Sequence, residues 1–178
     1  QLYREVYIMT KTRSHAFRSF AGALLFIVSV LPFASHATTL ADITAMVNQH
    51  QYAPALTALE SYLATNPVDA KAAFLKGVAL SELNRSAEAI AVFTKLTEDF
   101  PELPEPYNNL AVIYAKQNQL NEARHALEMA IRTNPSYATA HENLGDIYAR
   151  LASQAYGQAT QLDAANASAQ RKLMLLNS

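Results

Sequence analysis

Apolar and polar positions alternate with the period of an α-helix along most of the chain. In one stretch, four apolar residues occupy the i, i+3, i+4 and i+7 positions of a single helix face: Tyr107, Leu110, Ala111 and Tyr114. A second such face follows a polar turn and carries Ala123, Leu127 and Ala130. Asn118 lies in that turn, as Asn84 does one repeat earlier, and suits the left-handed backbone that a tight turn needs. The pattern predicts a helix, a short turn, a second helix, and then a proline that stops it.

This helix pair recurs every 34 residues. Three prolines stand at that interval: Pro67, Pro101 and Pro135. A column of small residues keeps the same interval, at Gly77, Ala111 and Gly145, and a column of large residues keeps it at Met46, Leu80, Tyr114 and Tyr148. We expect the small column to let paired helices approach closely, so that enlarging Gly77 or Gly145 would loosen the fold. Because one pair cannot bury its own apolar stripe, the pairs must stack into a solenoid.

The last repeat is shorter than the others. Tyr148 and Ala152 are four residues apart, where Tyr114 and Ala123 are nine residues apart, so the turn within the last pair is missing. Apolar residues keep their helical spacing through this point. We therefore expect one long helix from near Ala138 to near Leu162, with a shortened hairpin as the alternative. Residues 167–176 are amphipathic and predict a C-terminal capping helix.

These positions resemble the consensus of the tetratricopeptide repeat (TPR) family. The matching residues are Tyr107-Asn-Asn-Leu-Ala111, Tyr114, Glu122-Ala123, Leu127, Ala130 and Asn134-Pro135, and then His141-Glu-Asn-Leu-Gly145 with Tyr148. The resemblance covers roughly residues 38–166. It implies an all-α, TPR-type α-solenoid of antiparallel helix pairs in residues 38–178, with a modified last pair. The units would span about 38–69, 70–103, 104–137 and 138–166. The resemblance also implies a general role in holding a protein or peptide in a concave groove.

The first 37 residues have the three parts of a secretory signal peptide. Lys11, Arg13 and Arg18 precede an apolar stretch at residues 20–31, and Ser35-His-Ala37 provides a small-residue cleavage site. The apolar stretch of about a dozen residues is shorter than the roughly 20 that cross a bilayer, although retention as an anchor is the alternative. We expect cleavage near Ala37, export to a bacterial-type periplasm and a soluble product without a stable membrane span. Residues 1–8 then precede a start at Met9.

Charge and composition argue against several classes of function. The whole chain has a net charge of −1; without residues 1–37 it keeps 10 basic and 14 acidic residues, so no basic field attracts nucleic acid. The absence of cysteine excludes disulfides and thiolate metal sites. No histidine has a ligand-spaced partner, and no serine elbow or phosphate loop is present. We therefore expect no enzyme activity, no cofactor and no metal.

The candidate binding surface is the face of each first helix that lies opposite the predicted core. At 100° per residue this surface includes eight candidate contacts: Phe74, Val78, Asn108, Asn109, Val112, Asn143, Asp146 and Arg150. Asparagine amides can bond a peptide backbone, whereas Phe74 and Val78 could anchor an apolar side chain. The alternative for Asn109 and Asn143 is that they only support the fold.

Two functions are therefore open at this point. The first is a non-enzymatic periplasmic adaptor or scaffold that binds a protein or peptide of the cell envelope in the groove. The second is a structural homo-oligomerisation module that uses the long helix at residues 138–162 and the apolar tail after it.

Overall fold

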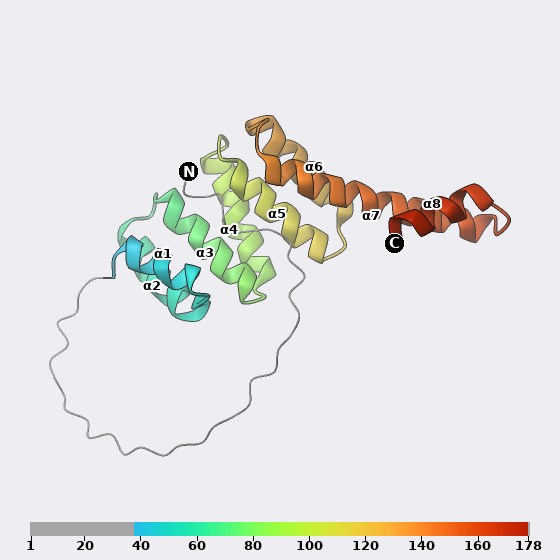
Figure 1. Ribbon diagram of the computed structural model, residues 1–178. Coiled ribbons are helices and arrows are strands. Elements are labelled where there is room, and N and C mark those ends of the chain that lie inside the picture. Colours follow the sequence, from blue (N-terminus) through green and yellow to red (C-terminus); the bar gives the residue numbers. More distant parts are fainter. Residues whose placement is uncertain (1–37, 178) are drawn as a thin grey trace, which may run out of the picture.

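The computed structural model describes residues 38–177, which form eight α-helices and no β-strand (Figure 1). The helices, in chain order, are α1 (Leu40–Asn48), α2 (Tyr52–Thr65), α3 (Ala70–Glu82), α4 (Ser86–Asp99), α5 (Pro104–Lys116), α6 (Leu120–Thr133), α7 (Ala138–Leu162) and α8 (Ala167–Asn177). The all-α prediction is thus confirmed. The signal peptide predicted at residues 1–37 lies outside the described residues. Within residues 38–177, no helix combines the length and apolar character that a membrane span requires.

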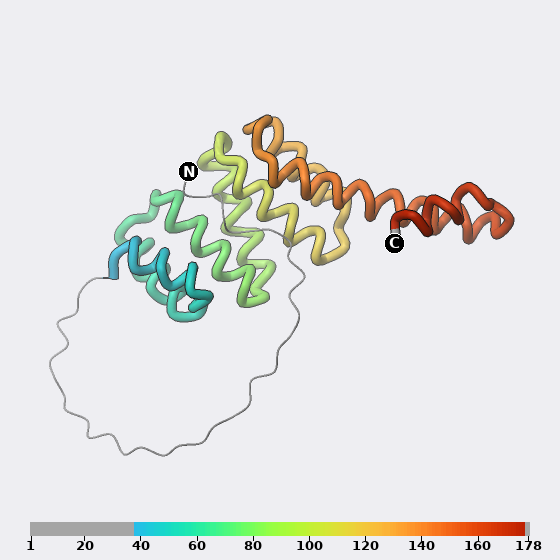
Figure 2. Tube along the Cα trace, in the orientation of Figure 1, coloured from blue at the N-terminus to red at the C-terminus, as the bar shows by residue number. Residues whose placement is uncertain are grey.

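The helices stack as consecutive hairpins along one direction (Figure 2). We call α1, α3, α5 and the first part of α7 the A helices, and α2, α4 and α6 the B helices. Each A helix contacts the next A helix, whereas the B helices of the described chain contact A helices but not one another. Helices on the inner side of a curved stack are closer together than helices on the outer side. The A helices therefore line the concave side, as the repeat predicted.

The turn within each complete pair has the same backbone conformation. His50, Asn84 and Asn118 have φ angles of 60°, 59° and 59°, which lie in the left-handed region. The N–H of the next residue then bonds a carbonyl one turn back in the A helix, as in Gln119 N to Tyr114 O at 2.9 Å. This arrangement satisfies the carbonyls at the helix end. The turns expected at Asn84 and Asn118 are confirmed, and His50 occupies the same position in the first pair.

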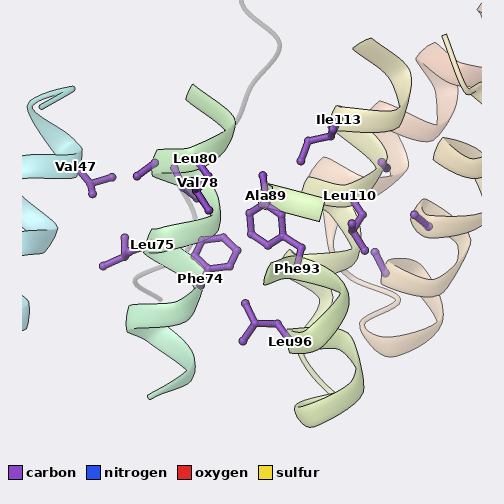
Figure 3. Close-up of a cluster of buried hydrophobic side chains, with 14 of the residues drawn as sticks. Val47, Phe74, Leu75, Val78, Leu80, Ala89, Phe93, Leu96, Leu110 and Ile113 are labelled. Carbon is purple, nitrogen blue, oxygen red and sulfur yellow. The ribbon is translucent and has the colours of Figure 1, made fainter. Parts of the chain in front are cut away.

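The core runs between the A and B helices of each pair. Figure 3 shows its centre, where the Phe93 ring of α4 lies beside the Phe74 ring of α3. A Cβ atom added to Gly77 would lie 2.6 Å from the Phe93 ring, so the close approach predicted for that glycine is confirmed. The same prediction is wrong for Gly145, because a Cβ atom there would meet no atom of the described residues within 4 Å apart from its own turn of helix. Gly145 is exposed since α7 has no B helix opposite it.

The last pair is a single continuous helix, as the missing turn predicted. Helix α7 has 25 residues, and its second part extends beyond the stacked pairs (Figure 1). Helix α8 then lies against that extension and, within the described residues, contacts no helix other than α7. We call residues 152–177, the second part of α7 together with α8, the C-terminal arm. The helix expected at residues 167–176 is present, and it covers the extension of α7 and leaves the end of the solenoid uncovered.

Candidate functional site

The candidate groove is formed by α3, α5 and α7, which lie side by side on the concave side. Each of these helices begins after a turn in which an N–H bonds the carbonyl three residues earlier, as in Tyr137 N to Asn134 O at 3.0 Å. This repeated turn gives the A helices a common orientation. The same positions of each repeat therefore lie next to one another across the concave surface.

The structure places six of the eight predicted contact residues in the interior. The buried residues are Phe74, Val78, Asn108, Asn109, Val112 and Asn143. Asp146 and Arg150, on α7, are exposed. The helical wheel of one helix divides it into a core face and an opposite face. In the solenoid, the A helices on either side cover much of that opposite face, so the wheel overestimated how much of it is open.

Phe74 and Val78 do not form the open apolar anchor that we predicted. Phe74 packs edge-to-face on Phe93 of α4, with 5.7 Å between ring centroids, and is 5% exposed. Val78 is 1% exposed. Both side chains are part of the core of the second pair, because α3 is packed between the first and third pairs. They stabilise the floor of the groove and offer almost no surface to a ligand.

The asparagine amides connect elements of the fold. Asn143 Nδ2 on α7 donates to Asn108 Oδ1 on α5 at 2.8 Å, and both side chains are buried. Asn109 Nδ2 donates to the carbonyl of Glu105 one turn back, at 2.9 Å. These bonds match the alternative that Asn109 and Asn143 support the fold, and Asn108 does so as well. Contact between these amides and a ligand stays a prediction.

Arg150 connects α7 to the end of α5. Its Nη1 donates to the carbonyl of Ala115 at 3.0 Å, and its Nη2 donates to Asn118 Oδ1 at 3.3 Å. Ala115 is in the last turn of α5, where carbonyls lack partners within the helix, so a guanidinium satisfies one of them. Two exposed carboxylates, Glu142 and Asp146, lie one turn apart on the same helix. We call these two residues the acidic edge of the groove.

A second concavity lies at the opposite end of the solenoid and was not predicted. It has a volume of about 1070 Å³, lies on α1 and α2, and is lined by apolar and hydroxyl side chains that include Leu40, Met46, Ala58 and Ser61. Tyr62 lines it as well and donates its hydroxyl to Asp69 Oδ2 at 3.1 Å, which raises the pKa of Tyr62. The first described pair has no earlier pair packed on this face. In the sequence, this concavity could be inferred only from the position at which the repeat begins, because the first pair has no preceding pair to cover it.

The titratable side chains of the described residues form no cluster suited to a metal ion. No group of three or more histidine, aspartate or glutamate side chains in residues 38–177 is arranged to hold a metal ion. Burial, together with the charge of Glu105, raises the pKa of Tyr137 to about 12. A hydroxyl with that pKa stays protonated at neutral pH and is a poor general base.

Two family models match the chain. A model described as TPR repeat matches residues 112–152, and a model described as tetratricopeptide repeat matches residues 43–104. Together they cover more than half of the chain. The TPR repeat-containing thioredoxin TTL4 of Arabidopsis thaliana is 38% identical over 65 residues, which are 36% of this chain and 10% of that protein. The chain thus spans a small part of that relative's length.

Solved structures show the same fold. The crystal structure of YrrB, described as a TPR protein with an unusual peptide-binding site, is 28% identical, with a TM-score of 0.55. The match covers 57% of this chain and 52% of that one. The first TPR domain of Spaghetti (RPAP3), bound to an HSP90 peptide, is 17% identical with a TM-score of 0.59, over 63% of this chain and 89% of that one. At that identity the second likeness shows the fold alone.

Proposed function

Because the chain belongs to the tetratricopeptide repeat family, we propose that it is a non-enzymatic adaptor that binds a protein or peptide in the concave groove. The observation that carries the proposal is the continuous surface made by α3, α5 and α7, which contact one another in sequence. A surface of this kind suits an extended or helical segment of a partner, since it repeats at the spacing of the A helices. The described residues hold no arrangement that suggests a reaction instead.

The likeness to YrrB supports a peptide as the class of ligand. That protein is described as having a peptide-binding site, and it is 28% identical to this chain over the matched part. The match covers about half of each chain. A peptide ligand is therefore our proposal for this protein, and the position of the site is argued from this chain's own residues.

The exposed part of the groove favours polar contacts of both signs. The acidic edge, Glu142 and Asp146, is exposed on α7, whereas Lys71 on α3 is half-buried and Lys116 at the end of α5 is exposed. Charges of opposite sign produce little net field at a distance, so electrostatic steering of a partner is weak. We propose that affinity changes little between low and physiological salt.

A crosslinking experiment tests the groove. A photoreactive amino acid at Asp146 should capture the partner in cells, because this side chain is exposed on the concave side. The matched control places the same amino acid at Glu122, which is exposed on the B helix α6. Capture from residue 122 and not from residue 146 would contradict the proposal and indicate that the convex side binds.

We further propose that the partner belongs to the cell envelope and that the chain acts in a periplasm. The support is the positive region, short apolar stretch and small-residue site in residues 1–37. N-terminal sequencing of the exported protein should find a start near Thr38. A product that keeps residues 20–34 in the membrane would contradict this proposal. It would not bear on the proposal that the groove binds a partner.

Self-association through α7 is a second candidate function. The observation that favours it is the apolar surface that the last repeat leaves open. Tyr148 on α7 is 49% exposed, and Leu162 at the end of that helix is 90% exposed. Both belong to a helix that has no B helix opposite its first part. Exposed large apolar side chains on the helix that ends the stack are the feature that favours self-association.

A further inference from the structure

We propose that a second copy of this chain supplies the B helix that the last repeat lacks. In this arrangement residues 152–162 of each copy pack against the first part of α7 of the other copy, and the two α7 helices run antiparallel. The proposal rests on the second candidate function, self-association, and adds the surface and the register. It concerns the far side of α7 from the groove's floor, so it does not depend on the peptide proposal.

The second part of α7 has the sequence of a B helix. The missing turn removes five residues, so the equivalent positions in the last two repeats are 29 residues apart. Ala123, Leu127 and Ala130 of α6 are nearly fully buried against α5. Their equivalents, 29 residues later, are Ala152, Tyr156 and Ala159, which again place a large residue between two small ones. These three residues are only partly buried in a single chain.

The first part of α7 has the sequence and shape of an A helix whose partner is absent. Gly77 in α3 holds the Phe93 ring of α4 so closely that an added Cβ atom would lie 2.6 Å from it. Gly145 is the equivalent glycine in α7, and apart from its own turn of helix no atom of the described residues lies within 4 Å of the corresponding Cβ position. Tyr156 is the equivalent of Phe93. By this equivalence, the Tyr156 ring is the group that would fill the open site at Gly145, as the Phe93 ring fills the site at Gly77.

Tyr156 cannot reach Gly145 within one chain. Eleven residues of continuous α-helix separate them, which is about 16 Å along the axis. In the complete pairs a turn brings the B helix back, as at Asn84 and Asn118, but this turn is missing from the last repeat. An element that cannot fold back on its own chain can make the same contact with an identical chain, which is the exchange known as domain swapping.

Antiparallel pairing of two α7 helices provides the missing B helix to both copies at once. The A and B helices of a complete pair are antiparallel, so the same packing between two chains places Tyr156 of each at Gly145 of the other. The contact has two-fold symmetry, so it joins two copies and leaves no open surface for a third. The α8 helix moves with its own arm: Lys172 Nζ lies 5.3 Å from the centre of the Tyr156 ring of the same chain. Helix α8 and the segment of α7 on which it packs thus belong to one exchanged unit.

The turn between α7 and α8 supports this assignment of the arm. Asp163 N bonds Ala159 O at 2.9 Å, and Asn166 N bonds Asp163 O at 3.1 Å. The turn between α6 and α7 has the same two bonds, from Asn134 N to Ala130 O and from Tyr137 N to Asn134 O. The arm is thus built as a B helix followed by the next A helix. The arm therefore continues the repeat pattern. Because the turn that would fold it back is missing, it lies outside the stack.

Light scattering on the full chain after size-exclusion chromatography tests the proposal, and we expect a dimer. Gly145→Leu should raise the dissociation constant of that dimer by about tenfold or more, because the added side chain occupies the place of the Tyr156 ring. Gly145→Leu should keep the circular dichroism of the fold, since a single chain leaves that position open. Gly157→Leu is the matched control: it makes the same change in the same helix, also with open space around it, but Gly157 lies about 100° around the helix from Tyr156, away from the face of Ala152, Tyr156 and Ala159, so the dimer should stay intact.

A second variant restores the missing turn. Inserting Gln-Asn-Gln before Leu151 and Asn-Glu after it gives the last repeat the spacing of the third one, with Leu151 at the position of the buried Leu120. We expect this variant to fold back on itself and become a monomer. Inserting the same five residues after Ala165, in the turn before α8, is the length-matched control and should stay a dimer.

The outcomes separate the exchange from self-association in general. A dimer that survives both Gly145→Leu and the five-residue insertion at Leu151 would overturn the exchange while leaving self-association through another surface. A wild-type chain that stays monomeric throughout the micromolar range would overturn both. Neither result bears on crosslinking from Asp146, which tests the groove.

Discussion

At the scale of residues, two glycines in one repeat column have opposite surroundings. Gly77 has the Phe93 ring where its Cβ atom would be, whereas the corresponding position at Gly145 is open. The sequence places them in the same column, and only the presence or absence of the B helix distinguishes them. The cost of adding a side chain is therefore set by the partner helix and cannot be inferred from the glycine alone.

Substituting Gly77 should destabilise the fold. Gly77→Ala puts a methyl group against the Phe93 ring, and we expect a loss of about 1–3 kcal/mol in the free energy of unfolding. The control is Gly157→Ala in α7, which has open space around it and should gain helix propensity, by up to about 1 kcal/mol. Thermal melts followed by circular dichroism measure both. Equal stability of Gly77→Ala and the wild type would mean that the Phe93 ring moves aside at no cost.

The buried amide pair between α5 and α7 gives a second prediction at this scale. Asn143→Ala leaves Asn108 Oδ1 without its donor, and an unsatisfied buried acceptor costs about 1–3 kcal/mol. Asn121→Ala, on the exposed side of α6, should change stability by no more than about 0.5 kcal/mol. Denaturation by urea compares the two variants. Equal midpoints would contradict the structural role that we assign to Asn143.

At the scale of elements, the repeat determined where helices begin and end. The long α7 was predictable from the spacing of the repeat columns. Tyr148 and Ala152 are four residues apart, where the equivalent residues of the previous repeat are nine apart, and four residues leave no room for a turn. The turns at Asn84 and Asn118 were predictable because asparagine tolerates the left-handed backbone. His50 has the same conformation, which histidine also adopts more often than most residues, but it lies in the first pair, where the repeat columns are weakest. Its role was visible only from its place in the first pair.

The candidate site was less predictable than the fold, for a physical reason. A helical wheel describes the faces of one helix, but the burial of Asn108 depends on α7, which is 35 residues further along the chain at Asn143. Phe74 was assigned to the open face by its angle on the wheel, although its ring is large enough to reach Phe93. Contacts between neighbouring repeats therefore decided which groove residues are exposed, and the period of one helix does not contain them.

The left-handed turns make a prediction at this scale. Asn84→Val should cost about 1–2 kcal/mol, because a branched side chain clashes with the backbone at a φ of 59°. Asn84→Gly should change stability by only a few tenths of a kcal/mol, since glycine adopts this φ without strain. Chemical denaturation of the two variants is the measurement. A Val variant as stable as the Gly variant would show that the turn changes its conformation.

At the scale of the whole molecule, the chain has a stacked part and a projecting part. Residues 40–151 form a continuous core through consecutive pairs, whereas the C-terminal arm contacts the rest of the described chain only through α7 (Figure 1). Stability in a solenoid is close to a sum over neighbouring units. The arm therefore adds little to the stability of the stack within one chain.

Removing the arm should leave the stack folded. A chain that ends at Leu151 keeps the first part of α7 against α5 and α6, so we expect a cooperative thermal transition within a few degrees of the full chain. Circular dichroism at matched concentration, kept below that of any dimer, is the measurement. Loss of the cooperative transition would show that the arm is part of the folding unit.

The continuity of α7 also has a mechanical consequence. The first part of this helix lies in the wall of the groove, bonded to α5 through Asn143 and Arg150, and the second part, which carries α8, continues the same helix beyond the stack of its own chain. From Leu151 to Leu162 this second part is about 16 Å long, so a tilt of about 10° at the groove would displace its tip by roughly 3 Å. The molecule thus has the geometry of a lever that pivots at the groove and carries α8 at its far end. Any ligand that changes the angle between α5 and α7 moves α8 with it.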